Sequence, residues 1–253
     1  MILPLLFTAT LGGSATAAIA ADRLPPGRYG MVLDTATVQK LPFLGDTRGG
    51  SRGWLLIDIE SSDDGLRQVM RTCDVIVTGL KGKEGRVDVP RAFIDSIPVN
   101  RRAIELGDDA GTGTKAATYT VDLGQNRVGW DPQRAARMPT TEANPAVTDS
   151  DGDGLPGATM QLRVPLFGRV DLYVVQHAHI SLWGAIEPGA VVRGGVTFHH
   201  MEQATIGASH SMFHASPDMR PDPDRSGFVL RPVPADTTCD TVRATMCTLG
   251  EGC

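Results

Sequence analysis

The chain has 253 residues and a formal net charge of −5 at pH 7, and 41% of its residues are hydrophobic. This length allows a single domain with a sizeable core. The mild negative charge and the lack of a basic stripe argue against nucleic acid as a partner, and an aromatic content of 5% argues against a carbohydrate platform of stacked rings.

Residues 1–21 carry no charge and have the layout of a secretory signal peptide. An apolar run from Ile2 to Phe7 gives way to small residues, and both Ala15-Thr16-Ala17 and Ala18-Ile19-Ala20 fit an A-x-A cleavage site. The chain lacks the usual Lys or Arg near its start, but the apolar part is shorter than the roughly 20 residues that a membrane anchor needs. We therefore expect cleavage of residues 1–21, a periplasmic or secreted mature protein, and no transmembrane segment after cleavage.

From Tyr29 onward the sequence is typical of β structure. Runs rich in β-branched and apolar residues are separated by Gly, Pro and Asp turns. They predict strands at Tyr29–Val38, Trp54–Glu60, Leu66–Thr78, Ala117–Leu123, Thr159–Leu166, Arg169–Trp183, Val191–Met201 and Gly227–Val233. The turn Ser61–Gly65 between the second and third runs predicts a β-hairpin. Val87–Pro98 fits either a strand or one helical turn around Phe93.

The segments between these runs are irregular, and the chain shows no amphipathic helical period and no solenoid repeat. Gly107–Lys115 is a flexible patch, and Asp131–Val147 and Pro217–Pro223 are proline-containing loops. We predict an all-β fold, an antiparallel β-barrel of lipocalin-like size, with a two-sheet β-sandwich as the alternative. Residues 22–238 form this domain, with an inserted loop at 149–157, and residues 239–253 form a cysteine-rich tail.

Four cysteines predict two disulfides. An even number of cysteines in an exported chain indicates disulfide bonds, and no C-x-x-C spacing supports zinc. Cys73 lies in the body of the domain, whereas Cys239, Cys247 and Cys253 lie close together at the C-terminus. Three pairings are possible, and the spacing favours Cys73–Cys239 with Cys247–Cys253.

Residues 149–157, with the sequence DSDGDGLPG, carry the most specific local motif. Asp149, Asp151 and Asp153 occupy positions 1, 3 and 5 of an EF-hand numbering, Gly154 occupies the turn position, and the carbonyl of Leu155 occupies position 7. The segment resembles the D-x-D-x-D-G calcium loops of EF-hands and thrombospondin type 3 repeats. This resemblance implies one bound calcium ion.

The second half of an EF-hand is absent. Met160 stands where an EF-hand has a bidentate glutamate, and no helix pattern flanks the loop. A further ligand would come from Asp171, opposite the loop in a predicted hairpin, or from Asp131 or Glu142 before it. The alternative is an acidic surface turn without an ion, because Asp and Gly also favour turns. Repulsion among three carboxylates favours the cation, and we expect a structural calcium site.

A wider resemblance includes this motif. Asp151–Thr159, Asp171–Gln176 and Leu182–Gly184 are similar to segments of a set of uncharacterised exported bacterial proteins. This resemblance implies export and a β fold, and it implies no activity.

The histidines are the second candidate for metal chemistry. On a strand, His177 and His179 point to one face, and His200 on the next strand faces them across a hairpin. Such a cluster suits zinc or copper. The alternative is a solvated strand face, with Leu172, Val174, Ala178, Ile180 and Leu182 buried on the opposite side.

No other catalytic motif is present. The sequence contains no G-x-S-x-G, dinucleotide-binding or phosphate-loop motif, and Gly207–Ser211 has only a superficial likeness to the first. We therefore expect a non-catalytic exported β-barrel with a structural calcium ion. It would bind a small apolar or amphipathic ligand or serve as an envelope module. The alternative is a metal-dependent enzyme that uses His177, His179 and His200.

Overall fold

The computed structural model describes residues 24–41, 45–78, 86–108, 117–164, 168–214, 216 and 218–253. The expected signal peptide at residues 1–21 lies outside these residues, as does most of the expected flexible patch at Gly107–Lys115. Within the described ranges, no helix is long and apolar enough to cross a membrane.

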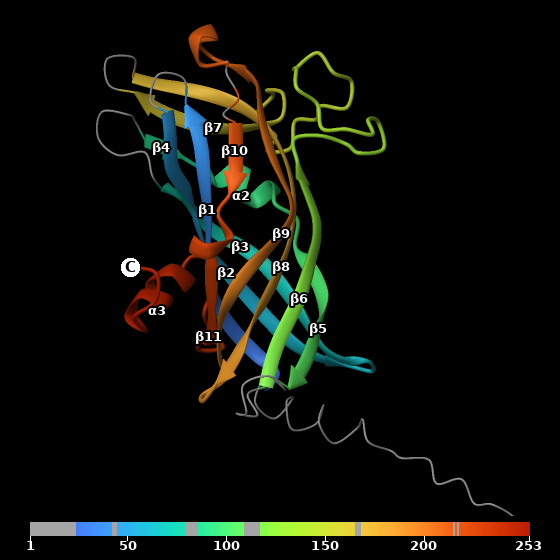
Figure 1. The fold of residues 1–253 in the computed structure, drawn as a ribbon, viewed down its shortest axis with the longest axis vertical. Helices are drawn as coiled ribbons and strands as arrows, with labels where there is room; N and C mark the ends of the chain where they lie inside the picture. Colours follow the sequence, from blue (N-terminus) through green and yellow to red (C-terminus); the bar gives the residue numbers. More distant parts are fainter. Residues whose placement is uncertain are drawn as a thin grey trace, which may run out of the picture.

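Strands make up most of the described chain (Figure 1). They are β1 (Gly27–Leu41), β2 (Gly45–Ser62), β3 (Gly65–Thr78), β4 (Arg86–Asp88), β5 (Asn100–Asp108), β6 (Ala117–Val128), β7 (Ala158–Val164), β8 (Gly168–Glu187), β9 (Val191–Ala208), β10 (Asp218–Pro221) and β11 (Gly227–Pro232). The short helices are α2 (Arg91–Ser96), η2 (Ser211–Phe213), η3 (Pro223–Arg225) and α3 (Val242–Thr248).

Eight of the strands form a closed ring in which neighbouring strands are antiparallel. The order around the ring is β1, β2, β3, β5, β6, β8, β9 and β11, and β11 pairs again with β1. The pairing of β8 with β9 completes the ring and extends from Leu172↔Ala208 to Glu187↔Val191. The prediction of an all-β antiparallel fold is confirmed, and the closed ring favours the predicted barrel over the two-sheet sandwich.

Side chains fill the interior of the ring. In β6, Ala117, Tyr119, Val121 and Leu123 are buried, and the residues between them are more exposed, as expected for a strand with one face inward. Buried residues of the other ring strands join them in one cluster. The Tyr119 hydroxyl lies 2.5 Å from Oε1 of Gln68 and donates a hydrogen bond to it, which satisfies this buried phenol.

β8 extends beyond the ring and supports a second group of strands. One edge of β8 pairs with β6 over its C-terminal half and with β7 over its N-terminal half, and β4 pairs with the far edge of β7. The predicted hairpin places Gln161 opposite Asp171. Residues 129–157 connect β6 to β7 and so leave the edge of β8 and return to it (Figure 1). They carry the aspartate motif.

The cysteine-rich tail folds against the outside of the ring, where Figure 1 shows α3 beside β1, β2 and β11. Val242 and Met246 of α3 are fully buried in a cluster with Val32, Trp54 and Cys73. The Arg243 guanidinium lies 4.4 Å from the centre of the Trp54 ring. The tail therefore covers an apolar patch that strands β1 to β3 would otherwise expose.

Four details differ from the sequence predictions or go beyond them. The strand at Asn100–Asp108 was not predicted, because charged residues interrupt its apolar pattern and Ile104 is the only buried residue among 100–107, where burial is described. The segment Val87–Pro98 contains both a short strand and a helical turn. Part of the expected loop Pro217–Pro223 pairs with β1 as β10, and the tail contains the helix α3.

Candidate metal site

The connection 129–157, which contains the aspartate motif, begins and ends beside Val174 of β8. Gly129 and Gly157 have φ values of +81° and +86°, and a Cβ atom on either would lie within 2.7 Å of the carbonyl oxygen of Val174. Only glycine fits this conformation and this close approach without strain. The Thr148 amide donates to the Gly129 carbonyl (2.9 Å), and its carbonyl accepts from the Gly157 amide (3.0 Å). These contacts close the base of the loop.

The carboxylates of Asp149, Asp151 and Asp153 converge. Their ligand atoms lie within 4.8 Å of one another, so they form a group that could hold a metal ion. Asp149 accepts hydrogen bonds from the amides of Gly152 (2.7 Å) and Gly154 (2.9 Å), both of which have positive φ. The glycines therefore let the chain wrap around the first carboxylate, as the D-x-D-x-D-G spacing predicted.

Thr159, the second residue of β7, connects the loop to the sheet. Its amide donates to Oδ2 of Asp151 (2.8 Å), and its hydroxyl donates to Oδ2 of Asp153 (2.6 Å). Oδ1 of Asp151 is buried and has no hydrogen-bond partner. Burial, and to a smaller extent the charges of Asp153 and Asp149, raise the pKa of Asp151, against the Thr159 amide bond, which lowers it. A cation would stabilise this carboxylate.

The further ligands proposed from the sequence do not belong to this converging group. The Leu155 amide donates to Asp153 (2.8 Å), and Asp171 forms an ion pair with Arg169 (2.9 Å) and is not among the three converging carboxylates. The pKa of Tyr173 is raised by burial and then by the charges of Asp171, Asp153 and Glu142. Glu142 and Tyr173 both approach Gly207, since Glu142 Oε2 and Tyr173 Cδ2 each lie 2.8 Å from the position of a Cβ atom built there. Asp171 lies two residues before Tyr173 on β8.

Asp131 serves the base of the preceding loop. It accepts a hydrogen bond from the Gln133 amide (2.9 Å) and pairs with Arg134 (3.3 Å). Its carboxylate thus has a local structural role.

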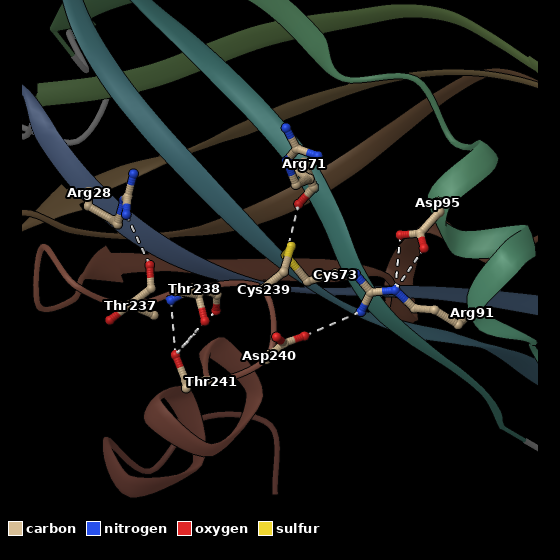
Figure 2. Close-up of a disulfide and its surroundings, with 10 residues drawn as sticks. All are labelled: Arg28, Arg71, Cys73, Arg91, Asp95, Thr237, Thr238, Cys239, Asp240 and Thr241. Carbon is tan, nitrogen blue, oxygen red and sulfur yellow. Dashed lines mark hydrogen bonds and ion pairs between the residues drawn. A yellow bond between two sulfur atoms is a disulfide. The ribbon is translucent and has the colours of Figure 1, made fainter.

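The four cysteines form two disulfides, Cys73–Cys239 and Cys247–Cys253, which is the pairing that the spacing favoured. Figure 2 shows the first bond joining β3 to the start of the tail. Beside it, the Thr237 carbonyl accepts a hydrogen bond from Arg28 (3.1 Å). The disulfide therefore fixes the start of the tail to the outside of the ring at β3.

The predicted histidine face lies on the outside of the ring, and its side chains form two pairs. The ring centroids of His177 and His200 are 4.2 Å apart, and those of His179 and His199 are 4.5 Å apart. His199 was not predicted to join this face. The register of β8 and β9 shifts between His179 and Ile180, and this irregularity brings two consecutive histidines of β9 against the histidines of β8.

A cleft of about 860 Å³ lies between β3 and the β4–β7 pair, and sequence reasoning did not find it. Pairing of β3 with β5 ends at Met70, which leaves the following part of this edge without β5 as a partner. The lining combines apolar and charged residues, namely Asp74, Val75, Ile76, Val77, Arg86, Val87, Asp88, Val89, Arg163, Val164, Gly168, Arg169 and Arg243. Among the described lining residues there are four arginines and two aspartates, so the charge of this part of the lining is positive.

Comparisons with protein-family models, with curated proteins and with solved structures find no match to this chain.

Proposed function

We propose that this chain is an exported, non-catalytic binding protein stabilised by one calcium ion in the Asp149–Gly157 loop. One observation carries the proposal: three carboxylates converge within 4.8 Å, and one of them has a buried oxygen without a partner. Leaving a buried charged oxygen unpaired is costly, and three adjacent carboxylates repel one another. A bound cation removes both penalties.

The ligand set favours calcium over a transition metal. Every candidate ligand at the loop is an oxygen atom, from the three aspartates and the Leu155 carbonyl, and hard oxygen ligands suit calcium. Calcium takes about six to eight ligands, and the loop offers three carboxylates and one carbonyl, so about two to four more are needed. Glu142, which lies beside Tyr173, Asp171, which lies two residues before it on β8, and water are the candidates for these positions.

The ion would act as a structural anchor. Asp151 and Asp153 both bond to Thr159, so ordering their carboxylates also orders the first residues of β7. β7 in turn carries β4, which forms one wall of the cleft. Calcium would therefore stabilise the loop 129–157 and the strands that depend on it.

Export is supported by the two disulfides, because such bonds persist in oxidising compartments. Calcium is abundant outside the cell, so a site with a dissociation constant near about 1 mM would still be filled there. The expected signal peptide is consistent with the same compartment.

We assign the ligand to the cleft beside β3, because the ring interior is filled by side chains. The valines and the isoleucine of the cleft suit an apolar chain. Arg163 and Arg169 are more than half exposed, and each pairs with a carboxylate through Nε, so their guanidinium groups keep further N–H donors. This combination suits an amphipathic ligand with an anionic head, such as a long-chain carboxylate.

The calcium proposal is tested by thermal unfolding with calcium and with a chelator. At about 100 times the dissociation constant, calcium should add about 2.7 kcal/mol and so raise Tm by roughly 5–10 °C. Asp151→Asn and Asp153→Asn should abolish this rise. Asp63→Asn, in an exposed turn far along the sequence, is the matched control and should retain it. Equal Tm values with and without calcium in the unmodified protein would contradict the proposal.

The ligand proposal is tested by titration with oleate at fixed calcium. Replacement of Arg163 and Arg169 by Gln should weaken binding by about tenfold or more, because each loses charged hydrogen bonds. Arg134→Gln, outside the cleft, should leave the affinity unchanged. Non-saturable binding of oleate to the unmodified protein would refute this assignment. So would an equal affinity for oleate in the Arg163 and Arg169 variants and in the Arg134→Gln control.

A further inference from the structure

On the outer face of β8 and β9, His177 and His200 differ from their neighbours His179 and His199 in their hydrogen bonding. Nε2 of His179 lies 2.8 Å from Oδ1 of Asp122, and Nε2 of His199 lies 2.8 Å from the Ser181 hydroxyl. By contrast, the Nε2 atoms of His177 and His200 are both buried and have no hydrogen-bond partner. Buried polar atoms are nearly always paired in folded proteins. Nε2 of His177 has no partner among the described residues, and Nε2 of His200 has only the Glu202 carboxylate, 3.3 Å away, with which it makes no hydrogen bond.

The two unpaired nitrogens belong to adjacent rings, whose centroids are 4.2 Å apart. Both side chains are partly buried, and the Trp130 ring packs against His177 at 5.9 Å with its edge. A neutral imidazole nitrogen is the usual protein ligand for zinc and copper.

Glu202 supplies a third ligand with the required charge. It lies directly opposite His177 in the strand register, and its Oε2 is 3.3 Å from Nε2 of His200. Arg127 is also opposite His177, on β6, and its positive charge disfavours a second cation. Metal binding here therefore needs the negative charge of Glu202 as well as the two imidazoles.

We propose that His177, His200 and Glu202 bind one divalent first-row transition-metal ion, with copper(II) bound more tightly than zinc(II). The order of affinity follows from the general preference of nitrogen ligands among these metals. Among the described residues, only the three aspartates of the calcium loop already converge as metal ligands. The ligand atoms of His177, His200 and Glu202 are farther apart, so the second site forms when Glu202 or one imidazole rotates towards the other two. His179 is not a ligand, because Asp122 already holds its Nε2.

The site is independent of the calcium proposal, because its ligands include nitrogen and lie on different strands from the aspartates. The experiment uses the chelator-treated full chain without a polyhistidine tag, in buffer with excess calcium so that the aspartate loop is saturated. Titration with copper(II) is followed by calorimetry, and the copper-loaded protein is examined by electron paramagnetic resonance. We expect one site per chain and hyperfine splitting from two imidazole nitrogens in the unmodified protein.

Variants separate the proposed ligands from their neighbours. His177→Gln, His200→Gln and Glu202→Gln should each weaken copper binding by at least about tenfold. His179→Gln and the exposed His214→Gln are matched controls and should bind copper with unchanged affinity. The proposal is overturned if the unmodified protein shows no saturable copper site or lacks nitrogen splitting. It is also overturned if His179→Gln weakens binding as much as His177→Gln does. The spectrum of the unmodified protein decides the matter even if a variant fails to fold.

Discussion

Loss of the Cys73–Cys239 disulfide should be the most damaging covalent change in this chain. The bond closes a segment of 166 residues, whereas Cys247–Cys253 closes a segment of 6. If the disulfide acts by restricting the unfolded chain, the loop-entropy relation gives about 5 kcal/mol for the first bond and about 2 kcal/mol for the second. The whole free energy of unfolding of a domain is about 5–15 kcal/mol, so the first loss removes a large part of it.

The assay is urea unfolding of the double variant Cys73→Ala/Cys239→Ala, with Cys247→Ala/Cys253→Ala as the control of equal chemistry. The first variant should lose about twice the free energy of unfolding that the second loses. Its tail should also become sensitive to trypsin at Arg243, because α3 is then held only by the burial of Val242 and Met246 and by polar contacts such as the 2.7 Å ion pair between Arg243 and Asp74. Equal losses in the two variants would refute the loop-entropy reasoning.

Three further predictions concern the ring, the cleft wall and the base of the loop. Tyr119→Phe removes the donor to the buried Gln68 and should destabilise the fold by about 1–3 kcal/mol in urea unfolding; an unchanged midpoint would show that this bond contributes nothing. Asp88 has a lowered pKa because Arg163, and then Arg86, hydrogen-bond its carboxylate. Asp88→Asn should lower the free energy of unfolding by less than about 1 kcal/mol, because both arginines are exposed. This difference between the variant and the unmodified protein should be present above about pH 4 and should disappear as the pH falls through the lowered pKa. Gly157→Ala should lower Tm and reduce the rise in Tm that calcium causes, because its Cβ would lie 2.6 Å from the Val174 carbonyl oxygen. Gly189 has a similar positive φ without a described atom within 4 Å of its Cβ position, so Gly189→Ala should keep the rise in Tm with calcium.

The features that could be predicted from the sequence are those encoded by consecutive residues. The aspartate triad and its glycines lie within nine positions, so their spacing alone indicated converging carboxylates. Most strands followed from β-branched runs between turn residues, and the Thr159–Asp171 hairpin followed in the same way. The disulfide pairing could be favoured because three of the four cysteines are crowded at one end.

The features that could not be predicted depend on register and on distant segments. His199 joins the histidine face only because the pairing of β8 and β9 shifts beside it. A regular alternation along β9 would point His199 and His200 to different faces of the sheet. The arginine-lined cleft combines residues from β3, β4, β7, β8 and the tail, so no local pattern marks it. The strand Asn100–Asp108 has too few buried residues to give a period of two.

Calorimetric titration of the chelator-treated protein with calcium would show whether Asp149, Asp151 and Asp153 hold one calcium ion. We expect a stoichiometry of about one calcium per chain, and we expect Asp151→Asn to remove this site because the variant loses a ligand carboxylate. Absence of saturable calcium binding in the unmodified protein, or an unchanged isotherm in the variant, would contradict this expectation.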